Sequence, residues 1–232
     1  MDRGGTVLIV KSEGLVLRKI PYKDNAVVVH ILTREFGKLG FLVRGLNGKK
    51  GTASLYQPGM LLNLVFYNSP RNGLCTVKDA SAITRVQLSP VAGMLQQLMI
   101  EMVIKSVPDE YADPAVFDLL KESFVALPHA KLTYFLHRFA IHFSQEMGCA
   151  IPLVAHHKSA VVAAYEGMIM QTVGNKFLPA DIVAIEKIEQ GFDPELSRQQ
   201  RGLLLNKLMT YFSLHVSQGK EIVGLRVLEQ LL

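Results

Sequence analysis

The sequence of 232 residues has few of the features that mark membrane-spanning, secreted or disulfide-bonded proteins. No apolar run approaches the roughly 20 residues that a membrane-spanning helix needs. The first residues, MDRGGTVLIVKSEG, lack a long apolar stretch and a small-residue cleavage site, so we expect no secretion signal. Only two cysteines occur, Cys75 and Cys149, and they form no CxxC pair. These absences favour a protein of the reduced cytoplasm without a membrane partner.

Motifs of nucleotide-binding and catalytic sites are also missing. The stretch FLVRGLNGKKG at 41–51 combines glycines with cations, but Lys49 is followed by Lys50 and not by the Ser or Thr of a P-loop. Neither GxGxxG nor a GxSxG nucleophile elbow occurs. Carboxylates are sparse in residues 1–85 and form no cluster of the kind that a metal-dependent nuclease needs. We therefore expect no enzyme and no cofactor.

Charge is distributed unevenly along the chain. Residues 1–85 carry 13 Lys+Arg against 5 Asp+Glu, a balance of +8, whereas residues 86–232 carry 12 against 15, a balance of −3. Such asymmetry indicates a polyanionic partner for the basic segment. An alternative without functional meaning is that basic residues happen to decorate one end of the molecule.

The apolar pattern changes character near residue 86. Before it, β-branched and partly alternating stretches predict five strands at 14–20, 26–33, 38–46, 60–67 and 74–83, separated by turn-forming residues. After it, apolar residues recur at helical spacing, and Ser197 with Gln200 predicts a capping box. We therefore predict an α+β protein with an OB-fold five-stranded β-barrel at 1–86 and an all-α helical domain at 87–232. Residues 149–178 form an irregular segment. Within it, SAVVAAYEGMIMQTV at 159–173 is either a short hairpin around Glu166 and Gly167 or part of a helix, and we favour the hairpin.

Basic residues lie in or beside the predicted turns and strands of the barrel. Lysine and arginine in such positions bind nucleic-acid phosphates, and aromatic side chains can stack on bases. Six aromatics, between Tyr22 and Tyr67, are interleaved with the cations, although core packing is the simpler role for each. We interpret 41–51 as a mobile basic hairpin able to lie along phosphates. The predicted DNA-binding residues are Arg18, Lys19, Lys23, Arg34, Lys38, Arg44, Lys49, Lys50, Arg71 and Lys78.

Two long stretches resemble the RecO DNA-repair and recombination-mediator family. The first is GLVLRKIPYKDNAVVVHILTREFGKLGFLVRGLNGKK at 14–50, followed by YQPGMLLNLVFY at 56–67. Its signatures are a GxVLR start, a PY turn, TREFGKL, and Arg-Gly after the third strand. The second comprises SRQQRGLLLNKLMTYFSLHV at 197–216 and LRVLEQLL at 225–232, which resemble the closing helices of the same family.

This resemblance implies a set of partners. Members of the family bind and anneal single- and double-stranded DNA. With RecR, they help RecA replace single-strand-binding protein (SSB), whose acidic C-terminal tail is a docking partner. For that tail we select Lys131 and Arg138, although an ordinary solvated helix end explains these residues equally well. Many relatives carry a four-cysteine zinc site after the helix that here ends at Gly148. This chain has only Cys149, His156 and His157 in that region, so we predict no metal.

Other functions remain open at this point. The chain could be an adaptor of the repair machinery whose barrel does not bind DNA. An RNA-binding barrel is a weaker alternative.

Overall fold

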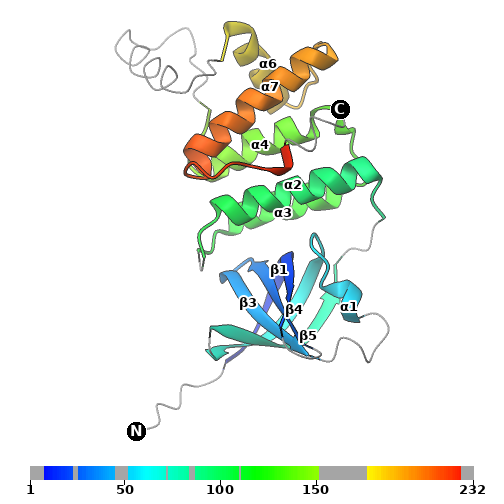
Figure 1. Cartoon of the computed structure of the whole chain (residues 1–232), viewed down its shortest axis with the longest axis vertical. Helices are drawn as coiled ribbons and strands as arrows, with labels where there is room; N and C mark the ends of the chain where they lie inside the picture. The colour runs from blue at the N-terminus through cyan, green and yellow to red at the C-terminus, as the bar shows by residue number, and fades with distance from the viewer. Residues whose placement is uncertain are drawn as a thin grey trace. The chain divides into compact units, whose positions relative to one another are not determined.

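The computed structural model describes residues 8–22, 26–44, 52–71, 73–83, 87–109, 111–151 and 177–225. Five strands are followed by helices, which confirms the predicted α+β class (Figure 1). The strands and the short helix among them are β1 (Leu8–Pro21), β2 (Ala26–Thr33), β3 (Gly37–Arg44), α1 (Thr52–Leu55), β4 (Leu61–Arg71) and β5 (Leu74–Ala82). The helices that follow are α2 (Pro90–Ser106), α3 (Pro114–Ala126), η1 (Leu132–Tyr134), α4 (Phe135–Glu146), α6 (Pro179–Glu189), α7 (Arg198–Tyr211) and η2 (Phe212–Val216).

The five strands pair in a closed ring in the order β1-β2-β3-β5-β4. Strand β1 closes this ring because its first half pairs with β4 and its second half with β2. The two pairings meet at Gly14, which lies opposite both Thr33 and Leu62. A Cβ atom at Gly14 would lie 2.6 Å from Ile31 Cγ2, so a glycine is required where three strands come together. The predicted first strand, 14–20, therefore began six residues too late.

Inward-facing side chains of all five strands form the barrel core. Alternate residues of β2 and β3, such as Val29, Ile31 and Phe41, are completely buried. Phe66 packs edge-to-face on Phe41, with ring centroids 5.1 Å apart. Helix α1, in a segment where we predicted no helix, contacts β5 (Figure 1). Its neighbour Tyr56 is 3% exposed and joins the same core.

The chain divides into two compact units, Met1–Pro128 and His129–Leu232. The first unit contains α2 and α3 as well as the barrel. The predicted boundary after residue 86 marks the change from strands to helices, and as a boundary between domains it stays a prediction. No helix in the described part of the chain is long and apolar enough to cross a membrane.

The second unit is built from the helices α4, α6 and α7. Tyr134, Ile185 and Leu208 belong to its buried cluster. Helix α4 ends before Gly148, whose φ of +73° and backbone N–H bond to the Gln145 carbonyl match the predicted stop. The predicted capping box of α7 is confirmed, because Ser197 Oγ accepts from the Gln200 N–H and the Gln200 side chain accepts from the Ser197 N–H. The predicted hairpin at 159–173 lies outside the described residues, as do all of residues 152–176.

Candidate nucleic-acid interface

Strands β2 and β3 have two ends with different surroundings. At one end Thr33 pairs with Gly37, and the nearby side chains contact α3 and the residues after α2. We call this the helix-facing end. At the other end Ala26 pairs with Arg44, close to the pair formed by Pro21 and Val27. We call this the distal end. Four of the predicted DNA-binding cations lie at these two ends, two at each.

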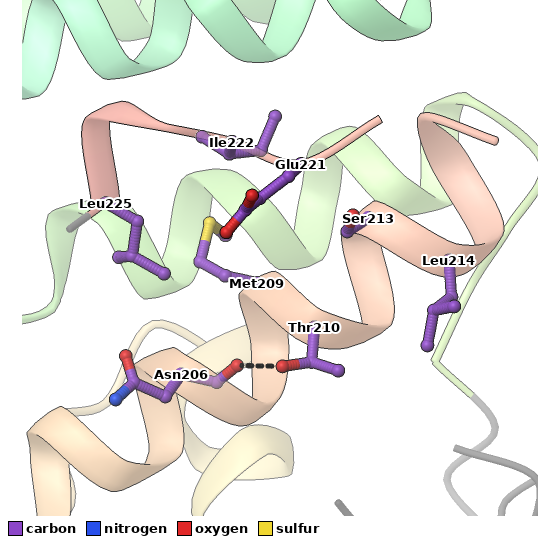
Figure 2. A pocket seen from close by; sticks show the side chains of 8 residues that line it. All are labelled: Asn206, Met209, Thr210, Ser213, Leu214, Glu221, Ile222 and Leu225. Carbon is purple, nitrogen blue, oxygen red and sulfur yellow. Dashed lines mark hydrogen bonds between the residues drawn. The ribbon is translucent and has the colours of Figure 1, made fainter. Parts of the chain in front are cut away.

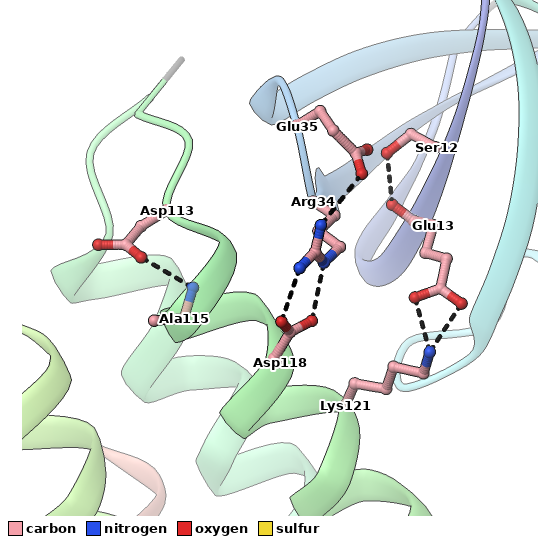
Figure 3. Close-up of polar contacts among 8 residues, drawn as sticks. All are labelled: Ser12, Glu13, Arg34, Glu35, Asp113, Ala115, Asp118 and Lys121. Carbon is pink, nitrogen blue, oxygen red and sulfur yellow. Dashed lines mark hydrogen bonds and ion pairs between the residues drawn. The ribbon is translucent and has the colours of Figure 1, made fainter.

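At the helix-facing end Arg34 is held by a carboxylate (Figure 3). Its Nε and Nη2 donate to the two oxygens of Asp118 on α3, both at 2.8 Å, and Nη1 lies 3.6 Å from Glu35. The bond to Asp118 raises the pKa of Arg34, and the same bond lowers the pKa of Asp118. A bidentate pair of this kind fixes the position of the guanidinium and neutralises its charge.

Two further ion pairs join the same end of the barrel to α3 and to the segment between α2 and α3. Lys121 of α3 donates to both carboxylate oxygens of Glu13 at 2.7 Å. Lys38 Nζ lies 2.9 Å from Asp109 and donates to the Ile104 carbonyl at 3.4 Å. The hydrogen bond from Lys38 lowers the pKa of Asp109. Arg34 and Lys38 are thus engaged within the protein.

At the distal end two predicted cations are exposed. Leu42 of β3 pairs with Thr76 of the parallel strand β5, and Arg44 and Lys78 each lie two residues further along. Lys78 is the additional residue of a β-bulge, because Phe66 pairs with Val77 and Val65 with Asp79. Neither cation forms an ion pair with the residues that the structure describes. The exposed carboxylate beside them is Asp79.

Two more of the predicted DNA-binding cations lie on β1, and the remaining four lie outside the description. Arg18 is exposed and pairs with His30, whereas Lys19 is half-buried and pairs with Val29. Lys23, Lys49 and Lys50 lie outside the described residues. Arg71 ends β4, and its side chain is likewise outside the description.

The interleaved aromatics are mostly core residues. Phe41, Phe66 and Tyr56 are buried, and Phe36 packs against Phe66. Tyr22 is 43% exposed at the end of β1, and Tyr67 is half-buried. The surface therefore offers few aromatic platforms, and phosphate contacts are better supported than base stacking.

A residue that sequence reasoning assigned to packing or to an ordinary surface lies beside one of the cations. The side chain of His30 has its Nε2 3.4 Å from Arg18 Nη2. Burial, followed by Arg18, lowers the pKa of His30. This pair could not be predicted from the sequence, because the register of β1 against β2 shifts between Val16 and Arg18. Without that shift Leu17 would face His30.

The two residues predicted to dock a partner peptide in the second unit are brought together by one carboxylate. Lys131 Nζ lies 2.7 Å from Asp193 Oδ2, and Arg138 Nη2 lies 3.3 Å from Asp193 Oδ1. Arg138 also donates to the carbonyls of Ile188 and Gly191. The hydrogen bond from Lys131 lowers the pKa of Asp193. Lys131 is well exposed despite this contact.

The described residues of the second unit contain no metal site, and the cavity that they line suits phosphate poorly. The described residues contain no group of three or more His, Cys, Asp or Glu side chains that could hold a metal ion. The Cys149 thiol donates to the His215 carbonyl, and His156 and His157 lie outside the description. A cavity of about 450 Å³ lies between α7, η2 and the residues after them (Figure 2). Its lining includes Glu221 and no cation, which makes it a poor site for phosphate.

Comparison with known proteins shows which sequences this chain is similar to. Residues 7–86 match the family model described as Recombination protein O N terminal, which spans all five strands. The chain is 22% identical over 237 residues to the DNA repair protein RecO of Azobacteroides pseudotrichonymphae, covering 95% of this chain and 98% of that protein. It is 23% identical over 252 residues to that of Syntrophus aciditrophicus, covering 95% of both. Against the RecO of Chlorobium luteolum it is 27% identical over 132 residues, which is 55% of this chain and half the length of that relative. These matches confirm the expected resemblance to the RecO family, over the barrel for the family model and over nearly the whole chain for two of the relatives.

Proposed function

We propose that the chain is a recombination mediator that binds and anneals DNA without catalysing a reaction. In this proposal it acts with RecR to help load RecA onto single strands coated with SSB. The observation that carries the proposal is the pair of exposed cations, Arg44 and Lys78, at the distal end of a barrel that matches the RecO N-terminal family. The excess of 13 Lys+Arg over 5 Asp+Glu in residues 1–85 supports it further.

We also propose that the barrel is an OB-fold and that residues 1–86 form the DNA-binding domain, followed by a helical domain at 87–232. The closed ring of five strands supports this assignment. We place the molecule in the cytoplasm, where its two cysteines would stay reduced.

Binding would begin with electrostatic capture. Phosphates release condensed counterions when lysine and arginine replace them, so affinity for the DNA backbone requires no sequence readout. We narrow the predicted contacts to Arg18, Lys19, Lys23, Arg44, Lys49, Lys50, Arg71 and Lys78, because Arg34 and Lys38 are already paired with carboxylates. With few exposed aromatics at the interface, the bases would remain available to a complementary strand.

The SSB tail is the proposed partner of the second unit. Lys131 and Arg138 both contact Asp193, so an acidic tail would have to displace the Asp193 carboxylate from the two cations. The relation to RecR and, through RecR, to RecA rests on the family alone.

A binding experiment tests the proposal. Lys49→Ala/Lys50→Ala should weaken binding of a fluorescent single-stranded oligonucleotide for all base compositions alike and flatten its salt dependence. The matched control is Lys187→Ala/Arg198→Ala, two exposed cations of the second unit. If the folded wild-type protein did not bind the oligonucleotide at low salt, that result would contradict the proposal and favour an adaptor role. RNA of equal length, used as competitor, addresses an RNA-binding role.

An annealing assay tests the mediator role itself. Complementary strands coated with SSB should anneal faster with the wild-type chain than with Lys49→Ala/Lys50→Ala. Equal annealing rates for the two proteins would show that Lys49 and Lys50 do not contribute to annealing.

A further inference from the structure

The contact between Arg18 and His30 is unusual because both side chains can carry positive charge. Arg18 Nη2 lies 3.4 Å from His30 Nε2, and the two residues are register partners on β1 and β2. With His30 neutral, Nε2 accepts from the guanidinium. With His30 protonated, both groups become donors, and an anion between them is needed to compensate the repulsion.

The register neighbour of His30 on β3 offers it no polar side chain, because it is Gly40. The apolar side chain of Leu74 occupies the space over this glycine, where a Cβ would lie 2.8 Å from Leu74 Cδ2. The charged groups that act on His30 are Arg18, Lys38 and Asp109. Asp109 is already bound to Lys38 at 2.9 Å, so the set has a net positive charge even while His30 is neutral.

We propose that Arg18 and His30 form a phosphate-binding subsite of the DNA interface, in which the His30 imidazole takes up a proton as a backbone phosphate binds. This inference rests on the proposed DNA binding and assigns a proton-linked contact to it. The guanidinium would donate to one phosphate oxygen and the imidazolium to another. The ligand class is the phosphodiester of a nucleic-acid backbone, which keeps its negative charge at any pH near neutrality.

The direction of the pH effect follows from linkage. In the free protein the pKa of His30 lies below its ordinary value of 6.5, mainly because of burial and the charge of Arg18. A bound phosphate favours the charged imidazole and raises the pKa. At high pH the imidazole is neutral in both states and contributes nothing. As pH falls, the complex takes up a proton before the free protein does, so affinity rises until the free protein is protonated as well.

His30 is well suited to a clean test because it is the sole histidine in residues 1–128. A thymidine oligonucleotide adds no group that titrates near neutral pH. If binding raises the pKa of His30 by roughly one unit, affinity changes by up to about tenfold. We expect the full-length wild-type chain to bind such an oligonucleotide about fivefold more tightly at about pH 6 than at about pH 8.

Two variants make the result specific. His30→Gln should bind with the weaker affinity at both pH values, because glutamine keeps a hydrogen-bonding group and cannot be protonated. His129→Gln, an exposed histidine of the second unit, should keep the wild-type pH dependence. Binding by His30→Gln with an unchanged pH dependence would overturn the proposal.

A measurement on the wild-type chain keeps the test independent of the variant's folding. The His30 imidazole resonance, titrated by NMR with and without oligonucleotide, should give a higher pKa in the complex. An equal pKa in both states would overturn the subsite while leaving DNA binding intact. If the wild-type chain did not bind the oligonucleotide at either pH value, that result would contradict the proposed DNA binding and, with it, the subsite.

Discussion

Cations of similar sequence context have different surroundings at the two ends of strands β2 and β3. At the helix-facing end, Arg34 and Lys38 are paired with Asp118 and Asp109 at 2.8 and 2.9 Å. At the distal end, Arg44 and Lys78 are exposed and have no ion pair with the described residues. The difference shows that a positive balance in the sequence overstates the charge available to a polyanion. The pattern of internal carboxylates decides which cations can act.

The largest expected effect comes from removing the distal cations. Arg44→Ala/Lys78→Ala should weaken binding of a single-stranded oligonucleotide by about tenfold or more at low salt, because each cation releases about one counterion on binding. Fluorescence anisotropy measures the affinity. Because both residues are exposed, circular dichroism should show an unchanged fold. An unchanged affinity would place the DNA interface elsewhere.

A substitution at Gly59 tests whether stability depends on the positive φ of this residue, which lies beside α2. Gly59 has φ of +90°, and a Cβ there would lie 2.3 Å from Cδ of Gln96 on α2. Gly59→Ala should destabilise the protein by about 1–3 kcal/mol, since a residue with a side chain is strained in this conformation. Denaturant titration measures the change. Gly93→Ala on α2 is the control, because a Cβ there meets nothing within 4 Å. Equal stability of both variants would contradict the strain expected for a side chain at this backbone conformation.

A paired cation of the helix-facing end can also be freed, so that it resembles the exposed cations of the distal end. Asp118→Asn removes the carboxylate that holds Arg34, so the guanidinium becomes available to phosphate. We expect affinity for DNA to rise by about twofold, because a single partly exposed charge is screened by salt. Asp113→Asn, at the N-cap of α3, is a control that changes the same charge without freeing Arg34. A larger gain for Asp113→Asn than for Asp118→Asn would show that overall charge, not Arg34, is responsible.

The smallest effect on binding is expected at the helix-facing end. Arg34→Ala/Lys38→Ala should leave affinity for DNA within about twofold of wild type, because neither cation is free in the unbound protein. The same variant should show a lower Tm, since Asp118 and Asp109 lose their partners. Thermal unfolding and anisotropy on one sample separate the two readouts. A large loss of affinity with an unchanged Tm would contradict the division between the ends.

Much of the fold could be predicted because it is encoded locally. The β-branched and partly alternating stretch AVVVHILT predicted the bounds of β2, and Ser197 with Gln200 predicted the start of α7. The first six residues of β1, LIVKSE, escaped prediction because three apolar residues are followed by three polar ones, which is not the alternation expected of a half-buried strand. They pair with β4 at the closure of the ring, in contacts between residues fifty or more positions apart.

The candidate site was less predictable, because its contacts also join residues that are far apart in the sequence. The partner of Arg34 lies 84 residues further along the chain, so no local pattern could reveal that this cation is neutralised. The contact between Arg18 and His30 depends on a register shift that the sequence does not announce. Type and number of charges could be read from the sequence, whereas their pairing could not.

The salt dependence of binding tests the central claim most directly. The slope of log affinity against log salt should decrease in magnitude by about 1.4 when Arg44 and Lys78 are both replaced, at about 0.7 per single-strand phosphate contact. It should stay at the wild-type value in Arg34→Ala/Lys38→Ala. Equal decreases in the two double variants, or an affinity that does not vary with salt in the wild-type chain, would contradict the account.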